Sequence, residues 1–156
     1  MATRPTNNLL IIRQLDKKLK NFQPFLTIPV PPRGWVNLIR ETLSMSLRQL
    51  GDRISITAQG VKDIETREEE GTITLKALKE VGEALGLKLV YAYVPLDDSL
   101  EKMIERKANE RARQIVSRTS TTMKLEDQEN TEERIEQAIA EMTEQIKREM
   151  PKSLWD

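Results

Sequence analysis

The sequence has no cysteine and no histidine, and aromatic residues make up only 4% of it. Without cysteine there is neither a disulfide nor a thiolate metal site, and without histidine there is neither an imidazole ligand nor the usual general base near neutral pH. No Gly-rich phosphate loop and no clustered pair of acids stands out. We therefore expect a protein that is not an enzyme and that needs no metal ion and no cofactor.

Long apolar runs are also missing. The longest apolar stretches, such as "NNLLIIRQL", fall far short of the roughly 20 residues that a membrane-spanning helix needs. The opening "MATRPTNN" shows no apolar signal-peptide region after a basic start. We expect a cytoplasmic protein with no membrane partner.

A net charge of zero, from 25 basic and 25 acidic residues, conceals an alternation along the chain. Residues 1–63 carry a net charge of +6, residues 64–100 carry −4, residues 101–124 carry +4 and residues 125–156 carry −6. Exposed charges are screened beyond about 8–10 Å at physiological salt, so local potential decides the partner. The basic first segment is compatible with a phosphate-rich ligand.

Apolar periodicity predicts a mainly α-helical chain in four parts. Residues 1–32 read as an N-terminal helix followed by a proline-rich, extended linker, and residues 33–86 as a compact helical domain. Residues 87–95, "LKLVYAYVP", alternate in the period of a strand that needs a partner, either the N-terminal arm or a second copy. Residues 96–156 read as a helical region, with its last helix capped by Asn130.

Within the compact domain, residues 47–64 have the apolar layout of a helix-turn-helix. Leu50 and Ile54 would bury the first helix, Ile56 would fill the turn, and two further apolar residues would bury the second helix. Gly51 is small where the two helices would cross. The outer face of the second helix is then available to a DNA groove.

The polar residues of this motif give the candidate DNA contacts. The candidate base contacts on the second helix are Ala58, Gln59, Lys62 and Asp63. The candidate phosphate contacts near the helix N-termini are Ser46, Arg48, Gln49 and Thr57. The alternative is an ordinary pair of helices with a solvated polar face.

At these residues the domain resembles the lambda-repressor/Cro type of helix-turn-helix protein, over roughly residues 34–86. The resemblance implies a five-helix fold and binding to double-stranded DNA. Two positions depart from the pattern, since Ser55 stands where the turn usually has glycine and Ala58 stands where a base-reading glutamine is common. The glutamine here is the next residue, Gln59.

A second resemblance spans nearly the whole chain. The segments "RQLDKKL", "PPRGWVNLIRETL", "GTITLKALKEVGEALGLKLVYAYVP", "TTMKLEDQ" and "LWD" resemble the family called mobile mystery protein A. That family is associated with a neighbouring Fic-domain protein. The resemblance implies an antitoxin that neutralises a Fic-domain toxin and represses its own operon.

Contacts with such a partner have two candidate locations. "TREEEG" at residues 66–71 resembles the inhibitory motif of Fic antitoxins, with Glu70 as the blocking carboxylate, although it also reads as the exposed acidic end of a helix. The last helix and the chain end offer an apolar stripe with an aromatic anchor: Ile139, Met142, Ile146, Leu154 and Trp155. That stripe could equally fold back onto the preceding helix.

Two classes of function follow. The first is a DNA-binding repressor and antitoxin that acts as a homodimer on a palindromic operator. The second is a protein-interaction module in which the helix-turn-helix only packs and the tails bind a partner. A steep salt dependence of DNA binding would separate the two, because phosphate contacts release counterions.

Overall fold

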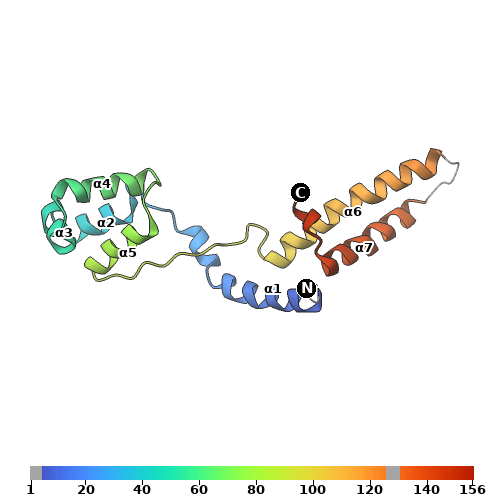
Figure 1. Cartoon of the computed structure of the whole chain (residues 1–156), viewed down its shortest axis with the longest axis horizontal. Helices are drawn as coiled ribbons and strands as arrows, with labels where there is room; N and C mark the ends of the chain where they lie inside the picture. Colours follow the sequence, from blue (N-terminus) through green and yellow to red (C-terminus); the bar gives the residue numbers. More distant parts are fainter. Residues whose placement is uncertain (1–4, 126–130) are drawn as a thin grey trace. The chain divides into compact units, whose positions relative to one another are not determined.

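The computed structural model describes residues 5–125 and 131–156 and is mainly α-helical (Figure 1). It divides into two compact units. One unit is Leu26–Tyr91, and the other combines Met1–Phe25 with Ala92–Asp156. The N-terminal helix thus belongs with the C-terminal helices, although the chain places the first unit between them.

The unit Leu26–Tyr91 contains the predicted helix-turn-helix region. Its helices are α2 (Gly34–Thr42), α3 (Leu47–Ile54), α4 (Ala58–Glu69) and α5 (Leu75–Ala84). The resemblance implied five helices, but within residues 26–91, all of which are described, there are four α-helices. Leu50, Val61 and Val81 lie at its centre, each no more than 1% exposed. One residue from each of α3, α4 and α5 therefore anchors the core.

The predicted strand at residues 87–94 is wrong for the single chain. These residues follow α5 as a drawn-out segment without secondary structure (Figure 1). A strand exists only where a second extended segment accepts and donates its ladder hydrogen bonds. The N-terminal arm, one predicted partner, is instead the helix α1 (Pro5–Lys20), whose backbone groups are largely used within the helix.

The other unit is built on a helical hairpin. Helix α6 (Leu100–Leu125) packs along α7 (Glu132–Glu149), and α1 lies against α6 (Figure 1). The buried core of the hairpin consists of Ile104, Ala108, Ala112, Ile139, Ile146 and Leu154. Two alanines one helical turn apart are fully buried on α6 and let the partner helix approach closely.

Helix α7 begins and ends with identifiable caps. The Thr131 side chain accepts a hydrogen bond from the Arg134 backbone N–H, and Met150 ends the helix in the left-handed conformation before Pro151. Asn130, the predicted cap, lies outside the described residues. Short 3-10 helices, η1 (Gln23–Thr27) and η2 (Lys152–Trp155), complete the chain, and η1 occupies the start of the segment predicted as an extended linker.

A carboxylate from α1 caps α6. The Asp16 side chain accepts hydrogen bonds from the Leu100 and Glu101 backbone N–H groups at 2.7 and 3.1 Å. The N-terminus of a helix leaves such N–H groups unpaired and carries a partial positive charge, so an aspartate there stabilises the helix. This contact fixes where α1 meets α6.

Among the helices in the described part of the chain, none combines the length and apolar composition of a bilayer crossing.

Candidate nucleic-acid interface

The turn between α3 and α4 depends on one left-handed residue. Ser55 ends α3 with φ 58° and ψ 40°, the conformation that glycine usually supplies at this turn. The next residue, Ile56, donates its backbone N–H to the Gly51 carbonyl at 2.9 Å. Serine therefore takes the conformation for which glycine is usual, and the departure noted in the sequence leaves the turn intact.

Gly51 is required by a close backbone approach. A Cβ atom at this position would lie 2.6 Å from the Ile56 carbonyl oxygen and 3.2 Å from that of Thr57. Only glycine fits such a distance, because the neighbour is backbone and cannot rotate away. Ile56 then lies over Gly60 of α4, so that the turn residue packs on the first turn of the second helix.

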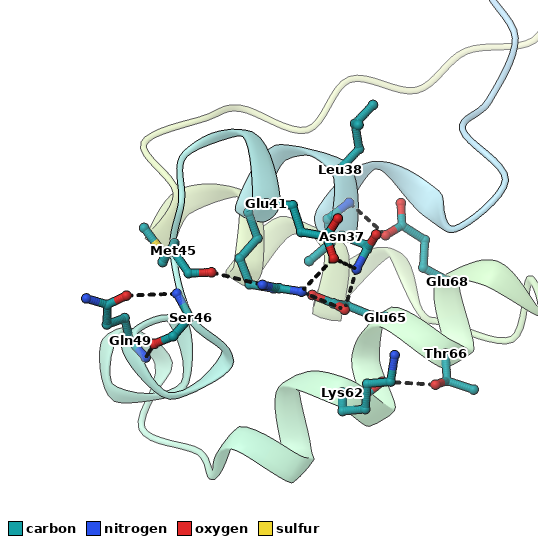
Figure 2. Close-up of polar contacts among 12 residues, drawn as sticks. Asn37, Leu38, Glu41, Met45, Ser46, Gln49, Lys62, Glu65, Thr66 and Glu68 are labelled. Atoms are coloured by element: carbon teal, nitrogen blue, oxygen red, sulfur yellow. Dashed lines mark hydrogen bonds and ion pairs between the residues drawn. The ribbon is translucent and has the colours of Figure 1, made fainter.

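Side chains cap both helices of the motif. The Ser46 hydroxyl accepts from the Gln49 backbone N–H at 3.1 Å, and the Gln49 side-chain carbonyl accepts from the Ser46 N–H at 2.8 Å (Figure 2). This reciprocal pair is a capping box. The Thr57 hydroxyl accepts from the Gly60 N–H at the start of α4. The capping box leaves the Gln49 NH₂ group without a protein partner in the described part of the chain.

All four candidate base contacts lie on the exposed face of α4. Ala58, Gln59, Lys62 and Asp63 are solvent-exposed, whereas Val61 between them is completely buried. Gln59 donates from its Nε2 to an Asp63 carboxylate oxygen at 2.9 Å. An amide NH₂ carries two hydrogens, so one donor and the amide carbonyl of Gln59 remain available.

Helix α4 carries four acidic residues, yet two of them turn away from this face. Glu65 is 3% exposed and accepts hydrogen bonds from Arg40 and Asn37 of α2 (Figure 2). Glu68 accepts the Trp35 and Val36 backbone N–H groups at 2.9 and 3.0 Å and thereby caps α2. These roles could not be predicted from the sequence, because the acidic run around both glutamates reads as a solvated helix end.

Both partners of the Arg40–Glu65 ion pair form additional hydrogen bonds. Burial alone raises the pKa of the Glu65 carboxyl, but the hydrogen bonds from Arg40 and Asn37 outweigh it and hold that pKa below its usual value. Arg40 also donates to the Met45 carbonyl at 2.9 Å. The Glu65 hydrogen bond is the largest cause that raises the pKa of Arg40, so both groups stay charged. The buried ion pair therefore holds α4 against α2.

Basic side chains flank the exposed face of the motif. Arg48 on α3 and Lys62 on α4 are exposed, and neither forms a side-chain ion pair within the described residues. Arg53 donates to the Ala84 carbonyl of α5 at 3.3 Å, and Arg67 donates to the Asp63 carbonyl at 3.3 Å. Backbone carbonyl oxygens thus hold the Arg53 and Arg67 side chains. The side chains of Arg48 and Lys62 remain available for phosphate.

The candidate partner contacts do not form one surface. Ile139, Ile146 and Leu154 are 4–6% exposed and belong to the α6–α7 core, with Met142 packed against them. The apolar stripe of the last helix therefore folds back onto α6 and is not a free docking face. Trp155 remains 52% exposed, and Glu70 is exposed at the C-terminal end of α4.

Comparison with known proteins adds no relative. No protein-family model, no curated protein and no solved structure matches this chain.

Proposed function

We propose that the protein is a sequence-specific DNA-binding repressor of the lambda-repressor type, with α4 as the helix that enters the major groove. One observation carries the proposal: Ser55 and Gly51 fix the α3–α4 turn, while Ala58, Gln59, Lys62 and Asp63 on the outer face of α4 are solvent-exposed. A helix-turn-helix reader needs a second helix held rigidly with its outer face uncovered.

The charges of α4 support the proposal. An acidic helix would be repelled by phosphate, but Glu65 and Glu68 are engaged with α2. On the exposed face, Gln59, Lys62 and Asp63 lie near the start of α4, and the exposed acid Glu69 lies at its C-terminal end. Local potential at the groove, and not the net charge of the chain, governs association.

The exposed groups match the chemistry of base edges. Gln59 offers one NH and one carbonyl toward adenine, Lys62 suits guanine or a phosphate, and the Asp63 carboxylate suits the amino group of cytosine. The Gln59–Asp63 hydrogen bond holds the glutamine in place before DNA arrives. Near the helix starts, Gln49, Arg48 and the Thr57 hydroxyl supply donors for phosphate oxygens.

The resemblance to mobile mystery protein A extends the proposal to a partner. In that extension, the protein acts in the cytoplasm as an antitoxin of a neighbouring Fic-domain protein and represses its own operon as a homodimer. The exposed Trp155 and Glu70 are the remaining candidates among the predicted contacts. An interaction module that neutralises a partner without specific DNA binding is the alternative.

A binding titration tests the DNA claim. Fluorescence anisotropy is measured on the DNA upstream of the gene and on a scrambled duplex, each at two salt concentrations. We expect selective binding that weakens steeply with salt, with a slope of about −0.9 per phosphate contact. Equal, weak binding to both duplexes would contradict the proposal and support the interaction module.

A further inference from the structure

An apolar groove of about 270 Å³ lies within the unit Leu26–Tyr91, between α2, α5 and the segment that follows α5. Residues 87–90 close one side of it. Both helices contribute large apolar side chains to its lining: Trp35 and Ile39 from α2, and Leu78 and Leu85 from α5. A mostly apolar lining with a few polar groups is typical of small-molecule sites.

The groove has room because α5 carries no side chain at Gly82. The helix ends in a Schellman motif, in which the Leu87 N–H donates to the Gly82 carbonyl at 2.8 Å and the Gly86 N–H donates to the Glu83 carbonyl at 3.0 Å. An apolar contact between the positions of Leu87 and Gly82 frequently accompanies this motif, but glycine supplies no side chain for it. The space therefore stays open between the helix and the segment.

The backbone does not require glycine at this position. Gly82 lies within the helix α5, and a Cβ there would lie 3.5 Å from the Leu87 carbonyl oxygen, which is an ordinary contact. Glycine inside a helix is less stable than alanine, since it loses more conformational freedom on folding. Gly82 thus destabilises the helix slightly and keeps the groove open, which indicates a use for the groove.

One charged group at the groove is free to bind a ligand. Glu68 of α4 lines the groove, but its two carboxylate oxygens accept the Trp35 and Val36 backbone N–H groups at 2.9 and 3.0 Å. Lys88 also lines the groove, is exposed and forms no ion pair with any residue that the structure describes. An available ammonium beside an apolar space favours a ligand with a carboxylate at one end.

The size of the groove limits the ligand further. An engineered cavity of about 150 Å³ in another protein holds one benzene molecule, so a space of about 270 Å³ suits about two fused aromatic rings. Trp35 is 43% exposed at this groove and offers an aromatic surface for such rings. A partner helix, about 10 Å across with its side chains, could insert only one or two side chains into this space.

We propose that this groove binds a small aromatic carboxylate, with its rings between α2 and α5 and its carboxylate at the Lys88 ammonium. The inference goes beyond the proposed function and does not depend on it, because the ligand is recognised by groups away from the exposed face of α4. Its tests use the full chain and no DNA, so a failure of DNA binding would be seen separately.

The first test is isothermal titration calorimetry with 2-naphthoate and with its neutral isostere 2-naphthamide. We expect saturable binding at one site per chain, with the carboxylate bound more tightly than the amide. The absence of saturable binding up to about 1 mM of either probe would overturn the proposal. Equal affinities for the two probes would overturn the role of the carboxylate.

The charge at Lys88 is tested with a surface substitution that leaves the core untouched. Lys88→Gln should weaken 2-naphthoate binding about two- to fivefold, the range expected for an exposed ion pair, and should not change the binding of 2-naphthamide. The matched control is Lys79→Gln, because Lys79 is an exposed lysine of α5 that does not line the groove. The same loss in both variants would contradict the placement of the carboxylate.

The location of the rings is tested by filling the groove. In Gly82→Leu the new side chain takes up the space beside Leu87, and the binding of both probes should weaken at least about tenfold. The control Glu83→Leu adds the same side chain at an exposed neighbouring position outside this groove and should bind both probes as the unmodified chain does. Urea unfolding verifies that both variants are folded. Unchanged affinity in folded Gly82→Leu, or an apparent dissociation constant that rises with protein concentration because a second copy competes for the groove, would overturn the proposal.

Discussion

Arg40 of α2 and Glu65 of α4 form an ion pair inside the unit Leu26–Tyr91, where their side chains are only 10% and 3% exposed. The pair fixes the orientation of α4 on its inner side and leaves the opposite face of the helix free. A buried pair of this kind is costly to break, because the remaining partner stays charged and unpaired.

Removing Glu65 should destabilise this unit strongly. For Glu65→Ala we expect a loss of about 3–5 kcal/mol in the free energy of unfolding, the range found when one partner of a buried pair is removed. Urea unfolding should be followed by Trp35 fluorescence in a Trp155→Phe background, because the two tryptophans lie in different units. The control Glu69→Ala removes an exposed acid of the same helix and should change stability by less than about 0.5 kcal/mol. Equal effects of the two substitutions would show that the pair is not buried.

The same carboxylate should make the unit sensitive to acid. The pKa of Glu65 lies below its usual value in the folded chain, so the unfolded chain binds more protons at acidic pH. The contribution of Glu65 is therefore complete above about pH 4.3 and is lost as the pH falls through the lower, folded-state pKa. Urea unfolding at a series of pH values should show a shallower acid-side loss for Glu65→Gln than for the unmodified chain. Parallel pH profiles would contradict the assignment.

Substitutions at two positions of the α3–α4 turn, Gly51 and Ser55, should have opposite effects on the stability of the unit. Gly51→Ala forces a Cβ against the Ile56 carbonyl and should destabilise the unit by about 1–3 kcal/mol. Ser55→Gly relieves a left-handed serine and should be neutral or stabilising by up to about 1 kcal/mol. Both are measured as Trp35-monitored unfolding midpoints. A Ser55→Gly variant that is clearly less stable would mean that the serine side chain, and not the backbone conformation, secures the turn.

The helical hairpin depends on the cap that α1 provides. Asp16→Ala removes the acceptor of the Leu100 and Glu101 N–H groups and should cost about 0.5–2 kcal/mol, the usual effect of losing a helix cap. Trp155 fluorescence in a Trp35→Phe background reports on this unit. Lys17→Ala, next to it on α1 and exposed, is the matched control. If both variants unfold at the same urea concentration, the cap does not stabilise α6.

Much of the helical layout follows from local rules, and the exceptions have physical causes. Ser46 and Thr57 precede the apolar-periodic runs of α3 and α4 and cap these helices, which is the usual role of a hydroxyl side chain at such a position. Helix α6 continues through the polar residues 117–122, which have no apolar periodicity that would predict a helix. Thr119 and Thr122 there donate their hydroxyls to carbonyls four residues earlier, so threonine is satisfied within the helix.

The exposed face of the candidate site could be predicted from the sequence, but the contacts that hold α4 against α2 could not. Exposure of Gln59 and Lys62 follows from the apolar spacing of α4. The inward turn of Glu65 and Glu68 does not, because it depends on a second helix whose position no local pattern specifies. The apolar stripe of α7 would look the same whether it met α6 or a partner, and only the three-dimensional packing shows that it meets α6.

The most direct test of the account is the affinity of Gln59→Ala, by anisotropy, for the DNA upstream of the gene. Its matched control is Gln145→Ala, because Gln145 makes the same kind of hydrogen bond to Glu149 at 2.9 Å in the other unit. We expect Gln59→Ala to lose about 1–3 kcal/mol of specific binding with an unchanged salt slope, while Gln145→Ala binds as the unmodified chain does. Unmodified affinity in both variants would contradict the claim that the exposed face of α4 reads DNA.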